Sequence, residues 1–373
     1  MAETVLTVTN TEALTPYEAA GGIPAPTPVP EPEPTPGAAP ERSSRSLPNK
    51  ASRRRYAIVL GVLVALSLLF GVGLLVWGNP LPFGTDGFWR IAEMRATTLV
   101  VMAVVAICQA TATVSFQTAT NNRIITPSIM GFEALYVAVQ TTAVYVLGVA
   151  GVMAVQGVSQ YLLQIVLMVG FSLALYGWLL SGKYGNIQVM LLIGIIIGGG
   201  LGSVSAFMQR MLSPSEFDVL SARLFGNMSN ADTDYLPIAV PLCLVAAGLL
   251  WLRSRHLNLL ALGRDAATNL GLNHRRQTMQ VLFLVSILMA VSTALVGPMT
   301  FLGFLVATLA YQFADTHDHR LVFPVAVLTC FVVLSGAYFV MRNVFYAAGS
   351  VSIIIELVGG SVFLFHILRK GRL

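Results

Sequence analysis

The run from Tyr56 to Gly78, YAIVLGVLVALSLLFGVGLLVWG, contains no charged residue and decides the fold class. The hydrocarbon core of a bilayer needs about 20 consecutive apolar residues per helix, and this run is long enough to cross it. Further runs of helix length follow along the chain. They lie at about 96–117, 129–149, 159–181, 187–209, 235–252, 278–297, 300–314, 321–341 and 351–368.

These runs predict an all-α integral membrane protein with about ten transmembrane helices. Helices are expected because every backbone polar group in hydrocarbon must be satisfied internally. Gly297-Pro298 separates the seventh run from a short eighth run, which suits a tight turn. If these two runs formed one helix, the count would be nine.

The composition supports a membrane protein over a soluble one. Of the 373 residues, 55% are hydrophobic and 10% are charged, against roughly 25% charged in an ordinary soluble domain. An outer-membrane barrel would show alternating segments of about ten residues, and these runs are longer and more uniform. Cys108, Cys243 and Cys330 lie in apolar runs, so we expect buried small side chains and no metal site.

Residues 1–50 differ from the rest of the chain. Between Pro24 and Pro36 every second residue is proline, which favours an extended chain without a core. A basic start followed by an apolar run, the mark of a signal peptide, is not found there. We predict a disordered, Pro-rich cytoplasmic tail over 1–50 and a transmembrane domain over 51–373.

The basic residues near helix ends predict the orientation, because cytoplasmic loops carry an excess of Lys and Arg. With the tail inside, fourteen basic residues fall on the inner side and five on the outer side. Both termini are then cytoplasmic, which requires an even number of helices. The net charge of +5 is thus explained by topology, and no nucleic-acid partner is expected.

The inner segment Ala261–Asn273, ALGRDAATNLGLN, could dock a partner protein. Asp265 could cap a short helix and Gly271 could end it. Two turns of amphipathic helix suit a groove in a partner, although a helix lying on the lipid surface would have the same pattern.

Several motifs together resemble the permeases of the vitamin B12, haem and ferric-siderophore importers. The segment Ala261–Asn273 resembles their coupling loop, and Val296–Leu305 resembles their glycine-proline turn followed by phenylalanine-leucine-glycine. Asp318-His319-Arg320, the block Phe116–Phe132 and the closing run Gly359–Phe363 match further family motifs, with Ser361 in place of a proline. The sequences of these motifs are most similar to those of the ferric-siderophore branch.

The resemblance implies a multi-pass permease of the bacterial plasma (inner) membrane that imports an iron chelate by alternating access. It also implies a second permease subunit (a heterodimer more than a homodimer), two cytosolic ATPase subunits that use ATP and Mg, and an extracytoplasmic binding protein. The residues expected to couple to the ATPase are Leu262, Gly263, Arg264, Asp265, Ala266, Ala267, Leu270 and Gly271. Those expected to dock the binding protein are Arg95, Arg223 and Arg342.

Polar and small residues within the spans are candidates for the translocation pathway. A charge at Glu356 would be costly in hydrocarbon, so it should be neutral, paired or facing a cavity. For Glu356 and for Glu133, two interpretations stay open: a role in the translocation pathway or a role in helix packing. The pathway residues we predict are Gln117, Thr126, Pro127, Gly198, Gly199, Ser203 and Glu356.

No catalytic motif is found in the sequence. Gly182-Lys183 is followed by Tyr184, so it does not complete a phosphate-binding loop. His317, Asp318 and His319 are adjacent, which suits a polar turn better than a metal site. We therefore expect no enzyme activity and no cofactor or metal bound by this chain. The alternative function is a secondary transporter driven by an ion gradient, with which the breaks at Thr126-Pro127 and Gly297-Pro298 are compatible.

Overall fold

A computed structural model of the chain describes residues 46–155, 157–181, 187–224, 228, 233–345 and 351–370. They belong to one compact unit, Arg45–Leu373. The predicted tail lies outside the described residues except for 46–50, so its disorder stays a prediction.

Every regular element of the described residues is a helix. The long or apolar helices are α1 (Lys50–Val76), α2 (Asp86–Ala119), α3 (Phe132–Ala154), α4 (Val158–Ser181), α5 (Ile187–Gln209), α7 (Leu236–Leu252), α10 (His274–Val296), α11 (Leu302–Ala314), α12 (His319–Asn343) and α13 (Val351–Lys370). The short elements are η1 (Pro127–Met130), α6 (Pro214–Leu224), η2 (Thr233–Tyr235), α8 (Ser254–Leu260) and α9 (Arg264–Asn269).

The predicted all-helical membrane fold is confirmed. Among the described residues, eight helices are long and apolar enough to cross a membrane, and α11 and part of α13 are shorter apolar helices. The seventh and eighth runs are separate helices, because the chain leaves α10 at Gly297, whose φ is +90°. The cytoplasmic placement of the two termini stays a prediction.

The predicted starts of the first two helices were too late. The helix α2 begins at Asp86, well before residue 96, and the Thr85 hydroxyl caps it by accepting the backbone N–H of Phe88 at 3.3 Å. The helix α1 begins at Lys50, ahead of its apolar run. A capped or solvated helix end continues beyond the apolar segment, so hydrophobicity alone does not mark it.

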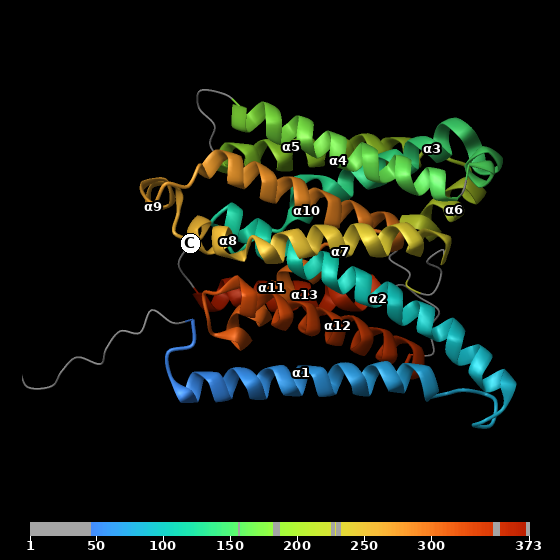
Figure 1. The fold of residues 1–373 in the computed structure, drawn as a ribbon. Coiled ribbons are helices and arrows are strands. Elements are labelled where there is room, and N and C mark those ends of the chain that lie inside the picture. Colours follow the sequence, from blue (N-terminus) through green and yellow to red (C-terminus); the bar gives the residue numbers. More distant parts are fainter. Residues whose placement is uncertain are drawn as a thin grey trace, which may run out of the picture. The chain divides into compact units, whose positions relative to one another are not determined.

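The core is built around α2 and α10. In their most apolar stretches 78% and 72% of the residues are buried, against 11% in α1, which lies beside α12 (Figure 1). The Gln109 amide of α2 donates to the Ser292 hydroxyl of α10 at 3.2 Å. The three cysteines are buried and free, as predicted.

Close backbone approach places two further elements. A Cβ on Gly198 of α5 would lie 3.0 Å from the Cα of Gly131, the left-handed residue between η1 and α3. A Cβ on Gly303 of α11 would overlap the Thr113 hydroxyl of α2. These glycines let α5 and α11 pack against their neighbours.

The helix ends fall into two groups that position the candidate sites. Figure 1 shows α8 and α9 at one end of the helices, which we call the α9 end, and α6 at the opposite end, which we call the α6 end.

Candidate functional site

The predicted docking segment, Ala261–Asn273, contains one short helix, α9, and a turn connects this helix to α8. The short helix predicted between Asp265 and Gly271 is present, but it begins at Arg264, ahead of Asp265, and covers only Arg264–Asn269. Gly263, with φ +90°, is the N-cap of α9 and breaks the helical path. Asp265 is therefore no cap; it lies in the first turn, where its charge favours the helix N-terminus.

The other end of α9 follows the prediction. Gly271 has a φ of +82°, and its N–H donates to the Thr268 carbonyl at 2.9 Å. The next N–H, that of Leu272, donates to the Ala267 carbonyl at 3.0 Å. This pair of bonds is a Schellman motif, for which glycine is the favoured residue. Gly271 thus ends the helix.

The exposed side of this segment is a compact surface at the α9 end. Leu262 and Leu270 are 58% and 62% exposed, which is high for leucine outside a membrane. Ala267 is fully buried and points into the chain, whereas the neighbouring Ala266 is exposed. We call five of its exposed residues the α9 face; they are Leu262, Arg264, Asp265, Ala266 and Leu270.

Behind the α9 face, side-chain hydrogen bonds tie α8 to α12. The Asn258 amide of α8 contacts both Asp318 and His319 at the start of α12, at 3.1 Å and 2.6 Å. Arg320 donates from Nε to the Ser254 hydroxyl at 3.2 Å. The sequence predicts a polar turn at His317, Asp318 and His319, and no local pattern in it points to Asn258 as their partner.

Arg95, predicted to dock a binding protein, caps a helix instead. Its guanidinium donates to the carbonyls of Leu74, Leu75, Trp77 and Gly78 at 2.9–3.4 Å. These are the carbonyls at the C-terminal end of α1, which have no partner within the helix. The side chain is 8% exposed, so its donors face this chain and not a surface.

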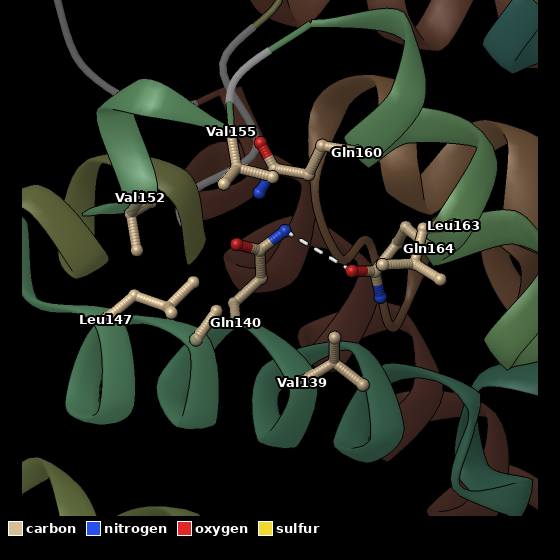
Figure 2. Close-up of a pocket in the computed structure, with 9 residues that line it drawn as sticks. Val139, Gln140, Leu147, Val152, Val155, Gln160, Leu163 and Gln164 are labelled. Carbon is tan, nitrogen blue, oxygen red and sulfur yellow. Dashed lines mark hydrogen bonds between the residues drawn. The ribbon is translucent and has the colours of Figure 1, made fainter.

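Arg223 lies on α6 and is held against α3. Its guanidinium donates to the Gln140 amide oxygen at 3.4 Å, and its carbonyl accepts the Tyr136 hydroxyl at 3.2 Å. Gln140 also donates to Gln164 of α4 at 3.5 Å, on the wall of a cavity of about 90 Å³ (Figure 2). Arg342, the third predicted docking residue, is half-buried beside Arg95 and Tyr338. The structure therefore does not gather the three arginines into one exposed patch.

The start of α6 is closed by a capping box. Glu216 accepts both the backbone N–H and the hydroxyl of Ser213 at 2.8 Å, and the Glu216 N–H faces the same hydroxyl at 3.4 Å. These bonds favour the charged carboxylate and lower the pKa of Glu216.

The predicted pathway residues divide into an enclosed group and an exposed group. Gln117, Thr126, Pro127 and Gly198 are buried within the chain, and Gln117 donates to the Arg123 carbonyl at 2.7 Å. Gly199, Ser203 and Glu356 are exposed. Only the second group is placed where a passage beside this chain could contact it.

Comparisons with known proteins agree with the fold and extend over almost the whole domain. The FecCD transport family matches residues 59–369. The petrobactin import system permease protein FatC of Bacillus anthracis is 51% identical over 332 residues, which cover 89% of this chain and 94% of FatC. The petrobactin import system permease protein YclO of Bacillus subtilis (strain 168) is 35% identical over 324 residues, covering 86% of this chain and 99% of YclO.

A solved structure has the same fold. It is described as an inward-facing conformation of a metal-chelate type ABC transporter, and its chain superimposes with a TM-score of 0.73 at 19% identity. The match covers 84% of this chain and 99% of that one. The arrangement of helices is thus that of a transporter subunit of known architecture.

Proposed function

The chain belongs to the FecCD transport family, and we propose that it is the membrane-spanning permease of an ATP-driven importer for a ferric siderophore. The observation that carries this proposal is the 51% identity to a petrobactin import permease over nearly the full length of both chains. The cargo class is accordingly an iron chelate of the petrobactin kind, moved inward across the bacterial plasma membrane.

A partner must supply the energy. The sequence has no phosphate-binding loop, and the α9 face offers two exposed leucines beside a small residue, Ala266, on a surface outside the membrane helices. Such a surface suits docking to the groove of another protein. We assign it to a cytosolic ATPase subunit, which would bind ATP and Mg and place the α9 end in the cytoplasm.

A second permease subunit is supported by the exposed group of pathway residues. Glu356 lies on the apolar helix α13 and is exposed. A carboxylate facing hydrocarbon is costly, so residues of this kind face a protein interior or a water-filled passage. A second permease, with a passage between the two subunits, would cover Glu356, and an extracytoplasmic binding protein would deliver the cargo from the α6 end.

The energy source separates this proposal from the ion-gradient alternative. The chain would be assembled with its ATPase, second permease and binding protein in proteoliposomes, and uptake of ferric petrobactin labelled with radioactive iron would be measured. We expect uptake with ATP and Mg on the side of the α9 end, and none with an ion gradient alone. Uptake that follows the ion gradient and ignores ATP would contradict the proposal.

A further inference from the structure

Asn258 of α8 is half-buried and is the centre of a group of polar contacts at the α9 end, which we call the joint. Its Oδ1 accepts the backbone N–H of His319 at 3.0 Å, and its Nδ2 donates to the Asp318 carboxylate at 3.1 Å. These two bonds fix which way the amide points, because Oδ1 only accepts and Nδ2 only donates. One side chain of α8 therefore holds two consecutive residues at the start of α12.

The imidazole of His319 carries the joint onward to α2. Its Nδ1 lies 2.6 Å from Asn258 Oδ1, so Nδ1 must carry the proton. Its Nε2 then has no proton and lies 2.7 Å from the Thr118 hydroxyl, near the end of α2; the one proton of this hydroxyl can go either to Nε2 or to the Val114 carbonyl at 2.8 Å. The ring is enclosed, with His319 only 3% exposed. Both ring nitrogens thus lie within hydrogen-bonding distance of a polar side-chain atom, and α8, α12 and α2 meet at the ring.

The turn that connects α8 to the α9 face is also held by hydrogen bonds and buried side chains. Three backbone N–H groups in the turn after α8, those of Ala261, Leu262 and Gly263, donate to carbonyls of α8 at 3.0–3.1 Å. Leu257 and Leu260 of α8 are buried, as is Ala267 of α9. A displacement of the α9 face therefore carries α8 with it and is not absorbed in a loose loop.

We infer that Asn258 and His319 are positioning residues of the transport cycle, which pass movement of the α9 face to α2 and α12. The inference rests on the proposed function, since it requires an ATPase on the α9 face. Its physical basis is that hydrogen bonds are directional. Bonds with fixed donors and acceptors hold α8 in one register against α12 and α2, whereas apolar contacts alone would allow α8 to slide. Neither residue lies on the α9 face or in the exposed pathway group.

The same end of the molecule provides a matched control. Arg55 of α1 and Asp315, in the turn before α12, form an ion pair at 2.7 Å. Both side chains are more than half exposed, and among the described residues neither forms a side-chain hydrogen bond or ion pair with α8. Solvent screens such a pair, so its loss should change little. Asp315→Asn removes a polar contact near α12 without touching the joint.

The experiment uses the assembled transporter in proteoliposomes, with ferric petrobactin as the probe, and compares uptake with ATP hydrolysis. In Asn258→Leu and Thr118→Val we expect the ATPase to assemble and to hydrolyse ATP at the parental rate. The amount of iron imported per ATP should fall on the order of tenfold, the usual size of a coupling effect. Thr118→Ser, which keeps the hydroxyl, and Asp315→Asn should keep the parental ratio.

Thr118→Val decides the matter if Asn258→Leu fails to assemble, because it removes one hydroxyl and keeps the side-chain shape. A Thr118→Val transporter with the parental ratio of uptake to hydrolysis would overturn the inference and leave the proposed function intact. A parental assembly without ATP-dependent uptake would overturn the proposed function and the inference together.

Discussion

The carboxylate of Glu133 accepts the backbone N–H of Met299 at 3.1 Å and so joins the start of α3 to the turn between α10 and α11. The same carboxylate accepts the Thr300 hydroxyl at 2.5 Å. Glu133 is 8% exposed, and each of its two oxygens accepts a hydrogen bond from a donor of this turn. The position favours the packing role over the pathway role for this residue.

Removing that carboxylate should destabilise the turn. In Glu133→Ala the Met299 N–H loses its acceptor, and a buried donor without a partner costs about 1–3 kcal/mol. Glu133→Gln keeps an acceptor and should cost less. The thermal midpoint of the purified chain in detergent measures this order. The account would be contradicted if Glu133→Ala unfolded at the parental temperature.

The glycine pair Gly359-Gly360 offers a test with a built-in control. A Cβ on Gly359 would lie 2.9 Å from Phe301 Cβ, whereas a Cβ on Gly360 would meet no atom within 4 Å. Gly359→Ala should lower the thermal midpoint of the isolated chain, at a cost of about 1–3 kcal/mol for overpacking. Gly360→Ala should leave it unchanged. Equal thermal midpoints for the two variants would contradict the close packing of Gly359 in α13 against Phe301.

Arg95 should behave as a structural residue. Arg95→Lys keeps the charge but loses the planar fork that reaches several carbonyls of α1, so we expect destabilisation of about 1–3 kcal/mol. Arg90→Lys, at an exposed position of the same helix, is the control. A variant at Arg95 with the parental midpoint but weaker binding of the binding protein would favour a docking role instead.

The capping box of α6 should depend on pH. Because the folded-state pKa of Glu216 is lowered, its stabilisation is present at neutral pH and is lost as the pH falls through that pKa. Hydrogen exchange at the α6 amides should therefore speed up in acid by more than the intrinsic chemistry predicts. Glu216→Gln should remove this additional dependence. An identical pH profile in both proteins would count against the box.

The long apolar helices could be predicted from sequence because bilayer thickness imposes a length on each apolar run. The helix starts could not, because side-chain caps such as Thr85 extend a helix beyond its apolar part. The candidate site was only partly predictable. Gly198 and Gly199 are adjacent and chemically identical, yet one is enclosed by Gly131 and the other is exposed. Packing between distant segments decides which is which.

The joint at Asn258 shows the same limit more strongly. Asn258 contacts His319, and His319 in turn contacts Thr118. These three residues lie far apart in the chain, and only folding brings their side chains together. By contrast, Gly271 was predictable as the end of α9 because its role depends on local backbone geometry alone.

The most direct test of the account is whether the α9 face binds the ATPase. Ala266→Glu places a charge on that face, where burial against a partner without a counter-charge would cost several kcal/mol. Ala222→Glu makes the same change at an exposed position of α6, at the opposite end. Co-purification of the ATPase with each folded permease is measured. The account predicts loss of the ATPase from Ala266→Glu and retention by Ala222→Glu; retention of the ATPase, with parental uptake, by Ala266→Glu would contradict it.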